Sequence, residues 1–119
     1  MDTDSLKLPE WIFSMNCAIT VVDKDCRIIY MNDRSRQTFA NRGGAKLIGH
    51  NIIDYHNPRS IEIIRRLLKE GGSNAYTIEK EGVRKMIYQT TWHKDDGSIG
   101  GLVELSMIIP EDMPHYIRH

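Results

Sequence analysis

Three side chains able to bind or transfer groups gather where a helix is predicted to begin. His56, Arg59 and Ser60 flank Asn57 and Pro58, and this Asn-Pro pair suits the N-cap and first position of a helix. The first backbone N–H groups of a helix lack partners within it, and the helix dipole adds partial positive charge. A guanidinium beside them suits a carboxylate or phosphate. We predict a ligand site at His56, Asn57, Arg59 and Ser60; the alternative is that Arg59 pairs with a nearby carboxylate and His56 caps a turn.

A metal site or a catalytic site is the second chemical hypothesis for this stretch. His50, Asp54 and His56 carry imidazole and carboxylate groups, which are ordinary zinc ligands, and they share one face if the segment is extended. Three ligands on one segment with no cysteine nearby favour capping or surface roles instead. No serine or cysteine nucleophile motif accompanies the Asp54–His56 pair. We therefore predict no metal site, no catalytic residues and no enzyme activity, with a small metal-dependent protein or enzyme as the alternative.

A carboxylate near the end of the chain admits two interpretations. Glu104 and Ser106 share one face of a predicted strand, flanked on that face by Leu102 and Ile108. The pattern favours a partly solvated outer face, packed against the N-terminal helix or a second subunit. The alternative is a buried carboxylate in a pocket, where its pKa would be raised and it could titrate with a ligand.

The elements that hold these residues follow the order two strands, helices, three strands. Strands are predicted at 18–23, 27–31, 76–79, 83–93 and 101–109. Asn32 caps a short helix, and the long helix from Pro58 to Glu70 ends at a pair of glycines. Hairpins at both ends and the absence of a βαβ unit predict an α+β fold, with an antiparallel sheet and helices on one face.

The two ends of the chain are predicted to lie outside this core. We divide the chain into an N-terminal segment with a helix (1–17), a central domain (18–109) and a tail (110–119). The N-terminal helix has an apolar stripe, which either packs on its own domain or forms a dimer contact; its members are Leu6, Leu8, Trp11, Ile12 and Met15. Whether the tail orders only on a partner is left open.

The composition of the chain indicates its cellular compartment and excludes some classes of partner. The chain has 119 residues, with 16 basic and 16 acidic side chains, so its overall charge favours neither nucleic acid nor an anionic membrane as a partner. Basic residues concentrate between 33 and 69, which favours a solvated helical face over attraction of an anionic ligand or acidic partner. With no long apolar run and no signal peptide, we expect a cytoplasmic protein without membrane contact. Cys17 and Cys26 are predicted free thiols, roughly 20 Å apart at opposite ends of a hairpin.

Three motifs occur in an order that resembles a known family. Residues 19–23 and 27–32 are similar to a "V-V-D…G-x-I-x-Y-x-N" opening, residues 47–49 to "L-x-G", and residues 96–103 to a closing "D-G-x-x-x-G-x-x" hairpin. Together they resemble the PAS domain, a sensory and signalling module, over residues 8–109. The His-x-Pro at 56–58 resembles a bacterial subgroup of that family.

The resemblance implies a five-stranded sheet of order 2-1-5-4-3 whose helical face encloses a pocket. Family members bind haem, flavin or small metabolites there, and many bind nothing and serve in dimerisation. Tyr30 and Tyr88 are candidate pocket walls. Haem sensors of the family use a histidine on the long helix, where this chain has Ile61 and Ile64, and the reactive cysteine of flavin photosensors is absent from the central helices. The cofactor is therefore left unknown.

From these observations we predict a non-enzymatic sensory module. A small ligand, for which an anion would suit Arg59, binds near the start of the long helix, and the signal passes through a homodimer or to a separate signalling protein. The alternative is a dimerisation or protein-interaction module without a ligand; a haem-binding or metal-binding sensor is a further alternative.

Overall fold

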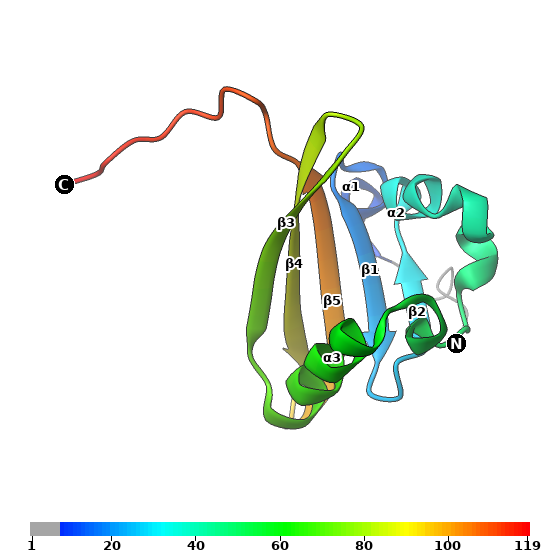
Figure 1. Ribbon diagram of the computed structural model, residues 1–119. Helices are drawn as coiled ribbons and strands as arrows, with labels where there is room; N and C mark the ends of the chain where they lie inside the picture. The colour runs from blue at the N-terminus through cyan, green and yellow to red at the C-terminus, as the bar shows by residue number, and fades with distance from the viewer. Residues whose placement is uncertain (1–7) are drawn as a thin grey trace.

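A computed structural model describes residues 8–119 as one antiparallel sheet with helices on one face (Figure 1). The strand order β2-β1-β5-β4-β3 is the order that the family resemblance implied, so this prediction is confirmed. The strands are β1 Ala18–Asp23, β2 Ile28–Met31, β3 Ser73–Lys80, β4 Val83–His93 and β5 Ile99–Ile108. The α-helices are α1 Glu10–Ser14, α2 Asp33–Thr38 and α3 Pro58–Glu70, and three short 3-10 helices are η2 Ala40–Arg42, η3 Gly44–Leu47 and η4 Ile52–Tyr55.

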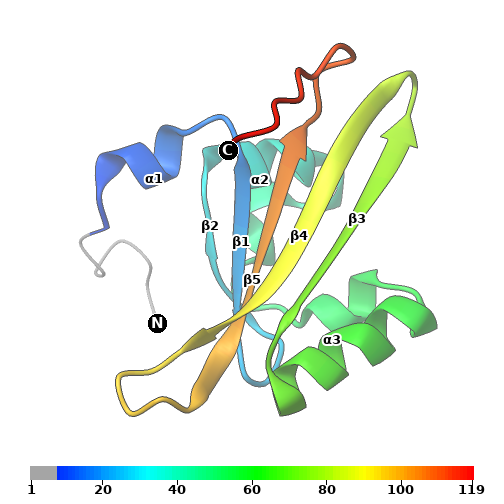
Figure 2. The same ribbon diagram turned by 90° about the vertical axis from the view of Figure 1, so that its left-hand side faces the viewer.

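Alternation along the central strands divides the sheet into two unlike faces. In β1, Ala18, Thr20 and Val22 are buried, whereas the residues between them are half-buried. Successive side chains of a strand point to opposite faces, so these three residues define the helical face of the sheet. Leu102 of β5 pairs with Val22 and joins the core beneath α3. Figure 2 looks onto the opposite side, the outer face, which none of the described helices crosses.

Helix α3 forms as its sequence predicts. The side chain of Asn57 accepts a hydrogen bond of 2.9 Å from the backbone N–H of Ser60, and Pro58 occupies the first turn. Gly71, with φ of 81°, ends the helix in a conformation that suits glycine. The buried face of the helix carries Ile64, Leu67 and Leu68, each contributing about 1.5–3 kcal/mol by burial.

The strand boundaries differ from prediction where pairing extends a strand. β3 begins at Ser73 rather than at residue 76, because Ser73 and Asn74 pair with Thr90 and Gln89 of β4. A partner strand that is distant in sequence thus recruits residues of weak strand propensity. β2 begins at Ile28 rather than residue 27, since Arg27 instead forms an isolated bridge to Asn51.

Asn32 holds the beginning of the fold together from a fully buried position. Its side-chain oxygen accepts hydrogen bonds from the N–H groups of Ile19, at 2.8 Å, and Ser35, at 3.0 Å. Its amide group donates to the carbonyls of Cys17, at 2.8 Å, and Ile12, at 3.1 Å. The predicted helix cap is therefore also the link between α1, β1 and α2, and all four hydrogen-bonding positions of the amide side chain are used.

A tryptophan braces the outer face over two glycines. The indole N–H of Trp92 donates a 3.0 Å hydrogen bond to the carbonyl of Val22, 70 residues away in the chain. The ring crosses β5 at Gly100 and Gly101, where an added Cβ would lie 2.2 Å from the Trp92 ring and 1.9 Å from the Val22 oxygen, respectively. Glycine is needed at both positions because no side chain fits between the strand and the indole.

The ends of the chain remain at the surface. No residue of α1 is buried; Trp11 is 65% exposed, and the guanidinium carbon of Arg36 lies 5.0 Å from the centre of the Phe13 ring. Leu6, the first member of the predicted apolar stripe, lies outside the described residues. From residue 110 onward the chain has no helix or strand and only a two-residue turn at 111–112. All its side chains from residue 110 are exposed. Among residues 8–119, no helix combines the length and apolar composition that crossing a membrane requires.

Candidate functional site

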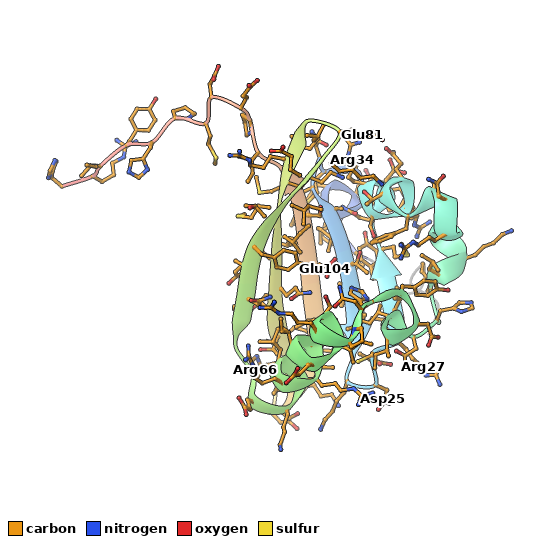
Figure 3. All side chains as sticks on the ribbon, in the orientation of Figure 1. Asp25, Arg27, Arg34, Arg66, Glu81 and Glu104 are labelled. Carbon is orange, nitrogen blue, oxygen red and sulfur yellow. The ribbon has the colours of Figure 1, made fainter. Side chains whose placement is uncertain are left out.

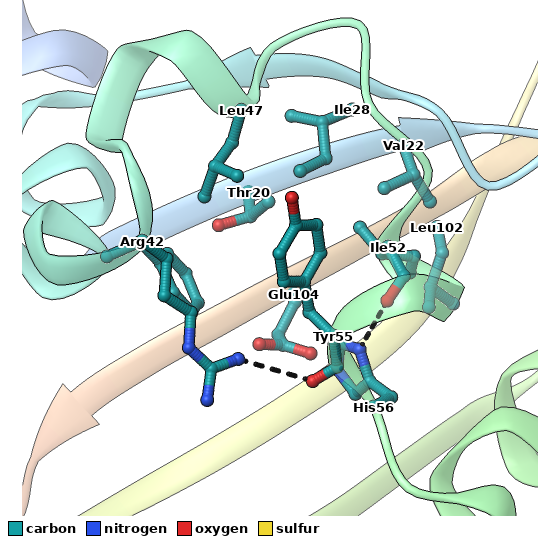
Figure 4. A pocket seen from close by; sticks show the side chains of 11 residues that line it. Thr20, Val22, Ile28, Arg42, Leu47, Ile52, Tyr55, His56, Leu102 and Glu104 are labelled. Carbon is teal, nitrogen blue, oxygen red and sulfur yellow. Dashed lines mark hydrogen bonds between the residues drawn. The ribbon is translucent and has the colours of Figure 1, made fainter.

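A small cavity lies between the helical face of the sheet and the segment that carries η3 and η4 (Figure 4). Its volume of about 30 Å³ has room for roughly two water molecules. Apolar side chains form most of the wall: Val22, Ile28, Phe39, Leu47, Ile52 and Leu102. A wider groove adjoins the cavity on the side of the β3–β4 hairpin, and the two spaces share six lining residues: Thr20, Phe39, Arg42, Tyr55, His56 and Glu104.

A row of polar side chains crosses the helical face of the sheet; Thr20 and Glu104 line the cavity, whereas Asn74 and Gln89 line a separate groove near the start of α3. The register places Asn74 of β3 beside Gln89 of β4, Gln89 beside Glu104 of β5, and Glu104 beside Thr20 of β1. These four residues, the polar row, are separated by up to 84 positions in the sequence. Polar groups on a buried sheet face cost free energy unless they are hydrogen-bonded, so the members of the row are expected to have hydrogen-bond partners.

Hydrogen bonds connect the members of the polar row in one direction. The amide N–H of Asn74 donates to Gln89 Oε1 at 3.1 Å, and Gln89 Nε2 donates to Glu104 Oε2 at 3.0 Å. Thr20 Oγ1 lies 2.6 Å from Ser35 Oγ of α2, and either hydroxyl can be the donor of this hydrogen bond. Gln89 is only 2% exposed, and its orientation is therefore fixed by its two partners.

Glu104 lies on the helical face and lines the pocket, so the prediction that favoured the outer face is wrong and the alternative placed the side chain on the correct face. It is half-buried, and it lines both the cavity and the adjoining groove. Figure 3 shows it in the middle of the molecule, whereas the other labelled charged residues lie at the periphery. The neighbouring Leu102 could have identified the face of Glu104 from the sequence, because a strand residue two positions from a core leucine faces the same side.

His56 and Arg42 hold the η4 segment over the pocket. His56 Nδ1 lies 2.8 Å from the carbonyl oxygen of Ile52, and Arg42 Nη1 donates to the carbonyl of Tyr55 at 3.3 Å. A carbonyl oxygen only accepts, so Nδ1 is the donor in this contact. Figure 4 shows the Tyr55 ring pointing into the cavity toward Ile28 and Leu47.

The structure divides the four residues predicted at the helix start. Only His56 lines the cavity. Asn57 uses its side chain as the N-cap of α3, and Asn57, Arg59 and Ser60 line a separate groove together with Asn74, Tyr76 and Gln89. Arg59 is exposed, and no described carboxylate lies within ion-pair distance of it. The helix start thus faces a solvent-exposed groove rather than the enclosed pocket.

Tyr30 and Tyr88 lie on the other side of the sheet and are not walls of this pocket. Tyr30 pairs with Val21, and Tyr88 pairs with Leu105, both residues of the outer face. The Tyr88 hydroxyl donates to Ser73 Oγ at 3.1 Å. Burial raises the pKa of Tyr30, and the nearby Arg36 charge opposes this shift only in part. A register shift between Val21 and Val22 decides the face on which Tyr30 lies, which alternation alone could not reveal.

Metal and haem chemistry fit the pocket less well than an organic ligand does. Nowhere in residues 8–119 do three or more histidine, cysteine, aspartate or glutamate side chains come together as they would around a metal ion, so His50, Asp54 and His56 are not gathered. Helix α3 contains no histidine, and the Nδ1 of His56 is bonded to Ile52. The cavity of about 30 Å³ is also far smaller than a haem.

Comparisons with known proteins were made for sequence and for fold. A family model described as the PAS fold matches residues 12–107. Among curated protein sequences, none matches this chain significantly.

Solved structures show the same fold at low sequence identity. The Aer2 receptor from Vibrio cholerae, described as a dual PAS–haem oxygen sensor, has 16% identity and a TM-score of 0.60, over 79% of this chain and 95% of that one. The PAS domain of BvgS from Bordetella pertussis has 17% identity and a TM-score of 0.62, over 92% and 89%. The VqmA dimer of Vibrio cholerae, solved without its target DNA, has 13% identity and a TM-score of 0.68, over 100% of this chain and 56% of that one.

Proposed function

This chain belongs to the PAS family, and we propose that it is a non-enzymatic sensory module whose ligand enters the pocket beneath η4. The observation that carries the proposal is the half-buried carboxylate of Glu104, which accepts a hydrogen bond from Gln89 and lies among mainly apolar walls. Folding alone does not require such a group, because an apolar side chain would fill the position at lower desolvation cost. Apolar walls with a few oriented polar groups are typical of small-molecule sites.

The sheet offers a direct route from the pocket to a partner surface. On β5, Leu102 and Glu104 face the pocket, while Val103 and Leu105 between and beyond them are half-buried on the outer face. A ligand that displaces the pocket side of β5 therefore changes a surface only one residue away. We propose that this outer face, together with the exposed apolar side chains of α1, contacts a second copy of the chain or a separate signalling protein.

A native mass spectrum of freshly purified protein tests both halves of this proposal, because it reports subunit count and bound mass together. The expected result is a dimer carrying additional mass that is lost on denaturation. His56→Ala is expected to lose or weaken that mass because His56 lines the pocket, whereas Arg59→Ala, in the neighbouring groove, is expected to keep it. Mass lost from Arg59→Ala alone would move the site to the start of α3.

The second candidate function is a dimerisation module without a ligand. The exposed Trp11 on α1 and the uncovered outer face favour it independently of the pocket. A dimer that carries no additional mass in the native spectrum would support this function over the sensory one. A monomer without additional mass would argue against both.

A further inference from the structure

Resting on the proposed function, we infer that the ligand is a small, largely apolar molecule that donates an N–H group, neutral or cationic, to the carboxylate of Glu104. An N–H donor is a more specific requirement than occupancy of the pocket alone, and it replaces the anionic ligand that the sequence led us to expect. The basis is the fixed orientation of the carboxylate, one of whose oxygens has no hydrogen-bond partner among the described residues.

The orientation of Glu104 follows from its neighbours on the polar row. Gln89 Oε1 is occupied by the Asn74 amide, so the Gln89 Nε2 donor is turned toward Glu104 Oε2. Among the described residues, no hydrogen bond reaches the other carboxylate oxygen, Oε1. An ionised carboxylate can only accept hydrogen bonds, and Oε1 therefore presents an open acceptor to the pocket.

Several polar groups of the inner cavity already have hydrogen-bond partners. Thr20 pairs with Ser35, His56 Nδ1 with the Ile52 carbonyl, and an Arg42 N–H with the Tyr55 carbonyl. Besides Glu104, the Tyr55 hydroxyl points into the cavity (Figure 4), and the rest of the wall is mainly apolar. An anion placed there would meet the charge of Glu104 in a medium that screens it weakly.

Cationic groups lie toward the outside of the same space. Arg42 is exposed, and Lys85 is half-buried on β4 at the adjoining groove. A ligand can therefore present an acceptor or anionic group outward, toward these residues, and its N–H group inward. This polarity distinguishes the pocket from the Arg59 groove, where no carboxylate is among the lining residues.

Tyr55 sets the size of the ligand. Its side chain lines both the cavity and the groove, and its ring points into the cavity (Figure 4). With the ring in place there is room for roughly two waters. Displacement of the ring would join the two spaces and free a volume of aromatic-ring size, which suits a ligand of one or two rings.

Indole and benzofuran test the inference because they have nearly the same shape, but only indole carries an N–H donor. Each is titrated into isotope-labelled protein and followed by NMR, with the largest shifts expected at Thr20, Leu47 and Leu102, which line the cavity. We expect indole to bind about tenfold or more tightly than benzofuran, since a hydrogen bond to a charged acceptor is strong. Benzoate, an anion of similar size, is expected to bind at least tenfold more weakly than indole.

The variant Glu104→Gln, titrated with the same two compounds, is the most discriminating test. Gln89 Nε2 would hold the new amide oxygen, so the new NH2 group would face the pocket and the preference should reverse in favour of benzofuran. Glu79→Gln, on an exposed carboxylate of β3, is the matched control and should keep the preference for indole. The wild-type preference alone decides the matter if Glu104→Gln does not fold.

Two results would overturn the inference. Equal affinities for indole and benzofuran at the pocket would show that the site binds without donor recognition, and the proposed sensory function would stand. No shift at the pocket with either compound at millimolar concentration would remove this ligand class, while the native mass spectrum would still decide separately whether the pocket holds a ligand.

Discussion

The two faces of one sheet show different uses of the same alternating pattern. The outer face is braced by Trp92, whose indole spans β5 and donates to the backbone of β1, and its remaining side chains are mainly apolar. On the helical face, Glu104 of the polar row lies among the mainly apolar walls of the pocket. The outer face therefore holds groups that the fold needs, whereas we expect the fold to tolerate the replacement of Glu104 on the helical face.

The largest expected effect is on the outer face, at the glycine beneath Trp92. Gly101→Ala would place a Cβ 1.9 Å from the Val22 carbonyl oxygen, in contact with backbone that has no room to shift. We expect a loss of more than about 3 kcal/mol in the free energy of unfolding, or no folded protein. Urea denaturation measures it. Gly97→Ala, in an open turn with positive φ, is the comparison and should cost only about 1 kcal/mol.

Trp92→Phe is expected to have an intermediate effect. The phenyl ring keeps much of the apolar contact over β5 but loses the hydrogen bond to the Val22 carbonyl. The expected loss is about 1–3 kcal/mol, from a smaller ring and an unpaired carbonyl. Trp11→Phe on the exposed surface of α1 is the control and should change stability by less than about 0.5 kcal/mol. Equal losses in the two variants would show that Trp92 does not brace the sheet.

The variant Glu104→Gln tests whether the fold depends on this residue of the helical face. The amide keeps the shape of the side chain and can still accept from Gln89 through its oxygen. We therefore expect stability within about 1 kcal/mol of wild type by urea denaturation at neutral pH. A loss as large as that of Trp92→Phe would show that Glu104 serves the fold, and the contrast between the two faces would fail.

The smallest expected effect is the loss of folding stability at alkaline pH that is linked to Tyr30. Burial raises its pKa above the ordinary value, so the folded state holds the phenol proton to higher pH than the unfolded chain does. The stability linked to Tyr30 is fully present below the unfolded pKa of about 10 and is lost as pH rises through the folded pKa. Tyr30→Phe should lose less stability than wild type between neutral pH and that range, measured by urea denaturation.

Tyr116→Phe is the control for Tyr30→Phe, because Tyr116 is 69% exposed and lies in the tail. Its alkaline loss of stability should match that of wild type. If Tyr30→Phe and wild type lost stability in parallel, the burial of the Tyr30 hydroxyl would not be the source of the effect.

Local signals in the sequence predicted most of the fold and one residue of the pocket. Asn57-Pro58, the glycines after Glu70 and the spacing of Ile64, Leu67 and Leu68 were sufficient for α3, because capping and helical periodicity act over a few residues. The motif order predicted the PAS family and the sheet order, and the family model and topology confirm both. His56 was found because histidine beside a helix start is conspicuous.

The sequence by itself determined which helices and strands form, which residues cap the helices and which family the chain belongs to, because these depend largely on neighbours in the chain. Only the tertiary structure decided which side chains share a pocket. Asn74, Gln89, Glu104 and Thr20 come from four strands, and pairing register alone sets them in one row. Register depends on contacts between strands distant in sequence, and a shift of one residue moves a side chain to the opposite face. That dependence explains why Glu104 was assigned to the wrong face and why Tyr30 was expected in a pocket that lies across the sheet from it.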